Sequence, residues 1–410
     1  MEIQRTKELD NLSVVKDRKL IKVVTGVRRC GKSTLLLQFQ DFVRRENPNA
    51  SIISINMDLP EFRFLAEQSW KKIYDFIRKK LRKKTTNYVF IDEIQNAAGF
   101  EKLLEGLFVT PNVDLYVTGS NAYLLSSELA TLLTGRAFEI NILPFSFGEY
   151  LEYTGGTRAG GTRSIEKAFG DYMRTGGFPE AAGLAQSGEH FAYDYLTTVF
   201  QNIYENDIQK RRAIQYETSY KEVVHFLIDS IGSSVSARNI ANVLTANGKK
   251  IDNKTVSKYI DTLVEAFLFY KVNRYDIKGR QHLATLEKYY LVDPGLRNAL
   301  LGKELSADRG HLLENIVFLE LKRRNCQVWI GKTDNLEVDF TIRDEHGYTR
   351  HIQVAYTVKE QKTLERELAP FAKIPDFNER LLLTMDHENG SHNGIKQMNV
   401  LDWLLGKATP

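Results

Sequence analysis

The sequence predicts an α/β protein of several domains whose N-terminal part is built on a parallel sheet. Three observations support this fold class. A chain of 410 residues is longer than one hydrophobic core usually organises. Strand-like and helix-like segments alternate between residues 21 and 143. A short apolar strand, a glycine-containing turn and a helix start also follow one another at residues 21–39. Such alternation is typical of parallel strands covered by helices.

Composition excludes several classes of protein. Hydrophobic residues make up 42% and charged residues 26% of the chain, as in ordinary globular proteins. A net charge of +4 is too small to indicate a nucleic-acid partner by itself. Two cysteines form no disulfide framework, and a reducing cytosol fits them. No stretch approaches the ~20 apolar residues of a membrane helix, and the N-terminus lacks a signal-peptide core. We expect a cytoplasmic protein with no membrane partner.

The turn after the first strand has the pattern G-x-x-x-x-G-K-S. Its residues are Gly26, Val27, Arg28, Arg29, Cys30, Gly31, Lys32, Ser33 and Thr34. Backbone N–H groups at the start of the following helix would bind a phosphate. Lys32 would reach the β- and γ-phosphates, and Ser33 would ligate Mg²⁺. A chance match in an ordinary strand–turn–helix is the alternative. The pattern predicts a nucleotide-binding loop.

A second motif follows a strand–helix unit formed by residues 51–56 and 67–84. Four apolar residues lead into two carboxylates at Tyr88–Gln95, which describes a buried strand with an acidic C-terminal end. After a phosphate loop this is a Walker B element. Asp92 would then hold the Mg²⁺ shell, and Glu93 would orient or deprotonate the attacking water. The presence of Glu93 favours hydrolysis of the nucleotide over binding alone.

Polar residues also end the next strand, Asp114–Thr118. Ser120 and Asn121 are placed to sense the γ-phosphate or to align the water, although a turn and helix cap explains them equally well. A helix over residues 122–133 then leads to Arg136. This arginine is a candidate to neutralise transition-state charge, in cis or from a neighbouring subunit. A homo-oligomer is therefore left open. Residues 137–143 form the last strand of this domain, which we place at residues 1–155.

Two units of different character follow. A glycine-rich break precedes helical patterns, which predict a helical lid at residues 156–215. Helix, turn, helix and a basic-tipped hairpin then predict a winged-helix domain at residues 216–300. If this domain binds double-stranded DNA, its second helix and hairpin supply the contacts; packing or docking of a protein partner is the alternative. The candidate DNA-contacting residues are Lys254, Thr255, Ser257, Lys258, Lys278 and Arg280.

The last unit, residues 301–410, has the element order of a PD-(D/E)XK nuclease core. Glu314 lies on a predicted helix and Asp339 on a predicted strand. In the third motif Gln353 replaces a metal-binding carboxylate, and Ala355 replaces the lysine. That chemistry needs clustered carboxylates for a divalent metal and a lysine to stabilise charge. We therefore expect a small α/β nuclease-like domain whose hydrolytic site is dismantled. Convergence of the three residues Glu314, Asp339 and Gln353 on one pocket is the test of this interpretation.

With these motifs in view, the whole chain resembles a large prokaryotic family of AAA+-like ATPases that carry a C-terminal winged-helix and nuclease-like region of uncharacterised role. The resemblance rests on Gly26–Ser33, Ile91–Gln95, Thr118–Asn121, Leu133–Arg136, Leu143–Phe147, Gly176–Glu180, Lys288–Asp293 and Gly310–Asn315. It implies an ASCE-type parallel sheet that uses ATP with Mg²⁺. It also implies Walker B roles for Asp92 and Glu93, a sensor at Ser120 or Asn121, and Arg136 as a candidate finger.

The leading interpretation is a Mg²⁺-dependent ATPase that couples its nucleotide state to a C-terminal DNA- or protein-binding module. One alternative is a nucleotide-dependent regulatory switch that does not bind DNA. Another is an ATP-gated DNA nuclease, against which the third motif of the last domain argues.

Overall fold

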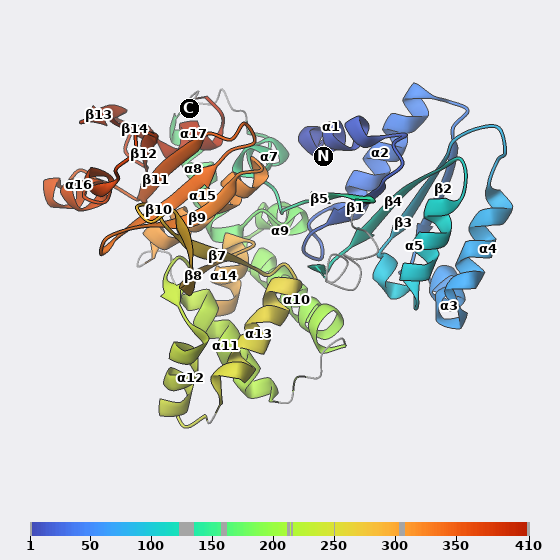
Figure 1. Ribbon diagram of the computed structural model, residues 1–410, viewed down its shortest axis with the longest axis horizontal. Helices are drawn as coiled ribbons and strands as arrows, with labels where there is room; N and C mark the ends of the chain where they lie inside the picture. Colours follow the sequence, from blue (N-terminus) through green and yellow to red (C-terminus); the bar gives the residue numbers. More distant parts are fainter. Residues whose placement is uncertain are drawn as a thin grey trace. The chain divides into compact units, whose positions relative to one another are not determined.

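The computed structural model describes residues 2–122, 135–156, 162–210, 214, 216–249, 251–302 and 308–407. Residues 123–133 of the predicted helix and residues 157–161 of the glycine-rich break lie outside these ranges. The chain forms two compact units, residues 1–142 with 265–267 and residues 143–264 with 268–410 (Figure 1). The sequence predicted four domains, with its first boundary at residue 155.

The N-terminal unit contains a five-stranded sheet of order β2-β3-β4-β1-β5, in which every pair of neighbours is parallel. This confirms the parallel sheet that the sequence predicted. The strands are β1 (Ile21–Thr25), β2 (Ser51–Asn56), β3 (Asn87–Asp92), β4 (Val113–Gly119) and β5 (Ala137–Asn141). Because all the strands run the same way, the residues that follow β1, β3 and β4 come together at one edge of the sheet.

Helices cover both faces of this sheet, which explains why β3 reads as a continuous apolar run. Val89 and Ile91 point to the face covered by α3 (Pro60–Gln68), α4 (Trp70–Lys80) and α5 (Phe100–Val109). Between them, Phe90 points to the opposite face. There it stacks on Tyr116 with ring centroids 4.7 Å apart and meets Phe39 of α2 (Lys32–Glu46). The α1 helix (Thr6–Val15) precedes β1, and a short 3₁₀ turn, η1 (Ile94–Asn96), follows β3.

The predicted helix over residues 67–84 is shorter in the structure, where α3 ends at Gln68 and α4 covers only Trp70–Lys80. Ser69 is extended, with φ −179°, and its hydroxyl accepts a hydrogen bond from the Lys71 N–H group. Serine favours such a cap over a helix interior because its hydroxyl competes for backbone groups. Consequently α4 begins afresh at Trp70. It buries Ile73 and Ile77 and leaves its lysines in solvent.

The C-terminal unit contains a nine-stranded mixed sheet of order β13-β14-β12-β11-β10-β9-β7-β8-β6. Its strands are β6 (Ser234–Val235), β7 (Phe269–Asp276), β8 (Gln281–Leu291), β9 (Gln327–Thr333), β10 (Leu336–Arg343), β11 (Thr349–Ala355), β12 (Glu379–Thr384), β13 (Gly390–His392) and β14 (Ile395–Asn399). The hairpin β7–β8 is antiparallel, and β7 continues in parallel pairing with β9. Residues on either side of the predicted boundary at 300 therefore share one sheet.

The helices of this unit come mostly before its sheet. They are α7 (Phe147–Tyr153), α8 (Thr162–Thr175), α9 (Pro179–Ala185), α10 (Glu189–Ile203), the π-helix η3 (Tyr204–Gln209), α11 (Glu217–Asp229), α12 (Ala237–Ala246), α13 (Asn253–Glu265), α14 (Pro294–Leu301), α15 (Arg309–Arg323), α16 (Gln361–Leu368), the 3₁₀ turn η4 (Phe371–Lys373) and α17 (Val400–Leu404). Phe318 of α15 stacks on Tyr290 of β8 with ring centroids 4.3 Å apart. That packing places the first turns of α15 over the sheet.

Asp293 connects α14 to the turn between α8 and α9. Its carboxylate caps α14 by accepting from the Leu296 N–H group at 3.0 Å, and it accepts from the Gly177 N–H group at 2.6 Å. Gly176 has φ 76°, and a Cβ atom there would lie 2.0 Å from the Asp293 Oδ1 atom. The Gly176-Gly177 pair therefore permits this close approach.

Within the described ranges, no helix is both long and apolar enough to cross a bilayer.

Candidate functional site

The phosphate-loop motif forms a tight turn between β1 and α2. Gly26 and Gly31 have φ 144° and 105°, conformations that L side chains rarely adopt. A Cβ atom on Gly26 would lie 2.2 Å from the Ile142 carbonyl oxygen, so only glycine fits there. The turn delivers the N-terminus of α2, where the first N–H groups have no helical partner. This is the geometry that an anion-binding loop requires.

Lys32 is folded into this loop. Its side chain is only 3% exposed, and its ammonium donates to the carbonyl oxygens of Gly26 at 3.0 Å and Val27 at 3.1 Å. The same nitrogen lies 3.7 Å from the Glu93 Oε1 atom. The carbonyl oxygens of the loop therefore hold Lys32 at the place where a phosphate would bind. The phosphate oxygens of a nucleotide would compete with these carbonyl oxygens for the hydrogen bonds of the Lys32 ammonium.

Asp92, at the end of β3, is joined to both the phosphate loop and β4. The Thr118 hydroxyl donates to its Oδ1 atom at 2.5 Å. Burial raises the pKa of Asp92, while hydrogen bonds from Thr118 and Ser33 act in the opposite direction. The contact with Ser33 matters because the sequence predicted these two residues as the Mg²⁺ ligands. The structure brings them together.

Glu93 lies next to this pair in a left-handed conformation, with φ 52°. Its N–H group donates to the Thr118 hydroxyl at 2.9 Å, so one threonine fixes both acidic residues. The Gln95 amide donates to the Glu93 Oε2 atom and, at 3.3 Å, to the Ser120 hydroxyl. Burial acts to raise the pKa of Glu93. The charges of Lys32 and Arg28, with hydrogen bonds from Gln95 and Ser120, outweigh burial and lower that pKa.

The sensor candidates Ser120 and Asn121 are both buried, at 0% and 2% exposure. Ser120 hydrogen-bonds to Glu93 as well as to Gln95. Sequence reasoning missed Thr118 and Gln95. The signal for Thr118 was a hydroxyl residue at the end of an apolar strand. For Gln95 it was an amide two residues after the acidic pair.

Arg136 does not join the other predicted residues. Its carbonyl oxygen accepts from the Ile21 N–H group, which places it at the start of β1, whereas the phosphate loop follows the end of that strand. Five strand residues separate the two sites by about 15 Å. The Arg136 guanidinium lies over the Phe108 ring at 5.6 Å. At this distance Arg136 does not reach its own phosphate loop, so its role as a finger stays a prediction that needs a neighbouring subunit.

Residues that precede β1 also contact the phosphate loop, and no sequence motif predicted this contact. The Arg5 guanidinium donates to the Cys30 carbonyl oxygen at 3.0 Å, and Arg5 is only 5% exposed. The Gln38 amide donates to the Ile3 carbonyl oxygen at 2.8 Å and so ties the same segment to α2. Burial raises the pKa of the Cys30 thiol, which donates to the Ile142 carbonyl oxygen at 3.6 Å. Cys30 is therefore a packed thiol.

In the C-terminal unit, Glu314, Asp339 and Gln353 line a single cavity of about 860 Å³. The Asp339 carboxylate accepts from the Val354 N–H group at 2.8 Å, and the Gln353 side-chain oxygen accepts from the Asp339 N–H group at 3.2 Å. The Gln353 amide nitrogen donates to Glu367 at 2.9 Å. The predicted convergence therefore occurs, with the glutamine fully engaged.

The candidate DNA-contacting residues are mostly exposed. On α13, Lys254, Ser257 and Lys258 face solvent, while the Thr255 hydroxyl donates to the Asp252 carboxylate at 2.8 Å as part of the helix cap. At the hairpin tip, the Lys278 ammonium is paired with Asp334 at 2.6 Å. Arg280 is exposed there with φ 50°.

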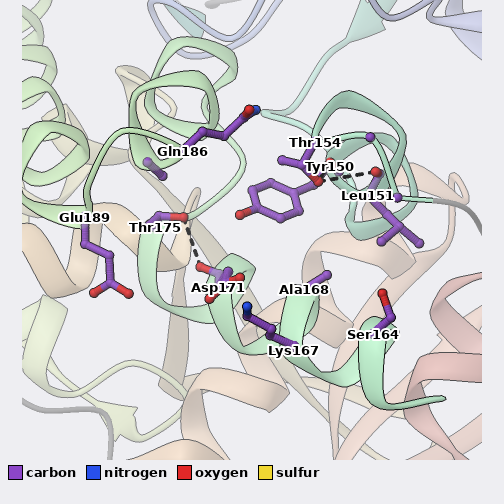
Figure 2. A pocket seen from close by; sticks show the side chains of 13 residues that line it. Tyr150, Leu151, Thr154, Ser164, Lys167, Ala168, Asp171, Thr175, Gln186 and Glu189 are labelled. Atoms are coloured by element: carbon purple, nitrogen blue, oxygen red, sulfur yellow. Dashed lines mark hydrogen bonds between the residues drawn. The ribbon is translucent and has the colours of Figure 1, made fainter. Parts of the chain in front are cut away.

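A second cavity, of about 550 Å³, lies among α7, α8 and the start of α10. Figure 2 shows the Tyr150 ring projecting into it, with Lys167 and Asp171 on the α8 side. Arg174 pairs with both Asp171 and Glu189, which neutralises the acidic lining. The cavity is polar without a concentrated charge, and no motif predicted it.

Comparison with known proteins places these residues in a family. Residues 18–151 match an AAA domain, and residues 166–307 match a domain of unknown function, DUF8612. An uncharacterized protein of Haemophilus influenzae is 38% identical over 408 residues, 98% of each chain. An uncharacterized protein of Methanocaldococcus jannaschii is 30% identical over 89% of this chain and 84% of its own. The Walker-type ATPase of Pyrococcus abyssi is 17% identical, with a TM-score of 0.48, and the match covers 73% of this chain and 96% of that one.

The AAA match spans the parallel sheet, the phosphate loop and the acidic pair Asp92–Glu93. The DUF8612 match crosses residue 215, where the sequence predicted a boundary between lid and winged helix. The relatives extend over almost the whole chain. The protein therefore belongs to the family of the Haemophilus influenzae protein, with an AAA domain of P-loop nucleotide-binding architecture at residues 18–151.

Proposed function

We propose that the protein binds ATP with Mg²⁺, hydrolyses it, and couples its nucleotide state to a C-terminal module that binds DNA or a protein. One observation carries the hydrolytic part. A buried carboxylate with a lowered pKa, Glu93, lies beside Lys32 and next to the Ser33–Asp92 pair. Nucleotide binding requires only the phosphate loop. Hydrolysis also requires a group that activates a water molecule, and an ionised carboxylate beside the loop can do this.

The residues present fit ATP with Mg²⁺. The Ser33 hydroxyl and the Asp92 carboxylate are hydrogen-bonded to each other, and oxygen ligands of this kind are the ones that Mg²⁺ prefers. The first N–H groups of α2, which have no acceptor within the helix itself, suit phosphate oxygens. When bound, Mg²⁺ would neutralise charge on the β- and γ-phosphates.

Each side chain then has a distinct task. Lys32 exchanges the carbonyl oxygens of its loop for phosphate oxygens. Glu93 orients a water molecule and accepts its proton, and Gln95 with Ser120 holds that carboxylate in place. Thr118 fixes Asp92 and the Glu93 backbone together, so the two acidic groups keep their spacing.

The C-terminal module is proposed from the order of its elements and from the exposed lysines of α13. The elements α12, α13 and the β7–β8 hairpin come in the order of a winged helix, and α13 presents Lys254 and Lys258 to solvent. The Lys278 ammonium is ion-paired with Asp334, and this pair reduces the net positive charge at the hairpin tip. Double-stranded DNA and a protein partner both remain candidates. We also propose that residues 156–215 form a lid and that residues 301–410 form a nuclease-like unit.

The experiment that separates these roles is ATP hydrolysis by wild-type protein with and without duplex DNA, at low and moderate salt. Turnover that rises with DNA, less so at higher salt, supports a DNA-binding module, because phosphate contacts weaken with ionic strength. Turnover that ignores DNA favours a protein partner. The regulatory switch instead predicts tightly retained nucleotide and negligible turnover under every condition. Lys32→Ala supplies the background rate in each case.

A further inference from the structure

The cavity lined by Glu314, Glu337 and Asp339 has a lysine against its carboxylates. Lys288 comes from β8, on the far side of the predicted domain boundary from all three acids. Its ammonium lies 2.8 Å from Glu337 Oε1, 3.0 Å from Glu314 Oε1 and 3.9 Å from Asp339 Oδ1. Its side chain is 4% exposed. Position 355 has no lysine, but Lys288 on another strand, β8, places an ammonium against the same group of carboxylates.

The carboxylates are also engaged by other groups. The Tyr290 hydroxyl donates to Glu314 Oε1 at 2.6 Å, and the Arg274 guanidinium pairs with Glu337 at 3.0 Å. Burial, with the charge of Glu314, raises the pKa of Asp339 well above its ordinary value, and Lys288 opposes this shift. Burial also acts against the charge on Lys288, yet Glu314, Asp339 and Glu337 together raise its pKa. The ammonium is therefore held charged by the cluster.

The position of the ammonium distinguishes two roles. Glu314, Glu337 and Asp339 line the cavity, whereas Lys288 does not appear among the described residues that do. A lysine that stabilises a scissile phosphate has to present its ammonium to the substrate. Lys288 lies behind the carboxylates, enclosed by three of them, and cannot make that contact without breaking its ion pairs. It has the position of a counter-ion.

The cavity also does not fit a metal ion. Over the described ranges, no group of three or more His, Cys, Asp and Glu side chains has an arrangement that could hold one. The amide at Gln353 stands where a third carboxylate would be, and both its polar atoms are hydrogen-bonded. Divalent cations at such sites need several oxygen ligands with uncompensated negative charge. Here the Lys288 ammonium and the Arg274 guanidinium already compensate part of that charge.

We infer that Lys288 is a built-in cation that pairs with Glu314, Glu337 and Asp339 where a divalent metal ion would otherwise bind, so that this cavity is a metal-independent site that does not cleave nucleic acid. The ion pairs also tie β8, part of the proposed winged-helix hairpin, to α15 and β10.

The test is Mn²⁺ binding to the nucleotide-free full-length protein. Binding is measured as the decrease of the electron paramagnetic resonance signal of free Mn²⁺. Wild-type protein is expected to bind no stoichiometric Mn²⁺. Lys288→Met, which keeps the volume of the side chain and removes its charge, is expected to bind Mn²⁺ on the order of tenfold or more tightly, since three carboxylates lose their counter-ion. Adding Asp339→Asn to Lys288→Met should abolish the gain. Lys271→Met is the matched control, because Lys271 pairs with Glu287 outside the cavity.

Two results would overturn the inference. One is stoichiometric Mn²⁺ binding, or Mn²⁺-dependent cleavage of duplex DNA, by wild-type protein that is lost in Asp339→Asn. The other is a folded Lys288→Met variant that gains no Mn²⁺ affinity. If Lys288→Met fails to fold, the wild-type arm still decides, together with Lys288→Arg, which keeps the charge and is expected to behave as wild type.

Discussion

The Lys32 ammonium lies 3.7 Å from the Glu93 carboxylate, so the phosphate-binding lysine and the proposed catalytic carboxylate are ion-paired. Two loop carbonyl groups complete the lysine's contacts. Nucleotide entry therefore has to transfer Lys32 from these oxygens to phosphate, and Glu93 then depends on Gln95 and Ser120 for its position.

Lys32→Ala is expected to weaken ATP binding by about tenfold to a hundredfold, since a charge-assisted hydrogen bond contributes about 1.5–3 kcal/mol. Calorimetric titration with a non-hydrolysable ATP analogue measures this. Lys71→Ala, on the exposed face of α4, is the matched control and should bind as wild type. Unchanged affinity in Lys32→Ala would contradict the assignment of the loop.

Gln95→Ala is expected to lower kcat on the order of tenfold while leaving KM nearly unchanged. The reason is that Gln95 contacts Glu93 and Ser120 but not the phosphate loop residues that bind nucleotide. Steady-state phosphate release gives both constants. Asn96→Ala is the control, because the Asn96 amide donates to the exposed Asp58 carboxylate at 2.9 Å. A rise in KM with unchanged kcat would show that Gln95 acts in binding instead.

Thr118→Val is expected to move the acidic limb of the pH–kcat profile to higher pH. The Thr118 hydroxyl stabilises ionised Asp92 and so opposes the rise in pKa caused by burial. Without it the pKa of Asp92 rises further, and protonation begins at higher pH as the solution is acidified. Thr118→Ser keeps the hydroxyl and should keep the wild-type profile. Identical profiles for the valine and serine variants would contradict this role.

Arg136→Ala is expected to reduce hydrolysis, and mixing it with Glu93→Gln should restore part of the activity. Each variant lacks one residue, and a site shared between subunits would be complete in a mixed assembly. The reason is that Arg136 lies at the opposite end of β1 from its own phosphate loop. Full activity in Arg136→Ala alone, or no recovery on mixing two inactive variants, would exclude the trans finger.

Asp293 should make stability depend on pH in the C-terminal unit. Burial raises its pKa to about 6, above its unfolded value of about 3.9. The folded state therefore binds the proton more tightly, and this contribution is present below about pH 4 and is lost as pH rises through 6. Asp293→Asn does not titrate. Its stability relative to wild type is therefore expected to improve by on the order of 2 to 3 kcal/mol between pH 4 and pH 7.

Calorimetric melting of both proteins across that range measures the difference for Asp293. The variant also loses one acceptor for the Gly177 and Leu296 N–H groups, which sets a constant offset. A difference that does not change with pH would contradict the raised pKa.

The sequence predicted those parts of the site that depend on local spacing. Residues 21–46 form strand, loop and helix because glycines, an apolar run and a helix start lie next to one another. Thr118 and Gln95 could not be assigned, because their contacts depend on the β3–β4 register, in which Ile91 lies opposite Val117. The split at Ser69 depends on one cap within an otherwise helical pattern.

Contacts distant in sequence were the hardest to predict. The parallel pairing of β7 with β9 joins strands that are separated in the chain by β8 and two helices, and no periodicity in the sequence predicts it. Lys288 is the sharpest case. The motif of the last domain predicted a lysine at position 355, and alanine there indicated a dismantled site. The structure shows a lysine reaching the same carboxylates from β8.

The central claim is that this protein hydrolyses ATP by means of Glu93, and steady-state phosphate release by wild type, Glu93→Gln and Lys32→Ala tests it most directly. We predict Mg²⁺-dependent turnover in wild type. Glu93→Gln should lose on the order of a hundredfold or more in kcat, because a general base contributes about 10²–10⁴-fold, while ATP still binds. Wild-type turnover no higher than that of Lys32→Ala, or full turnover in Glu93→Gln, would contradict it.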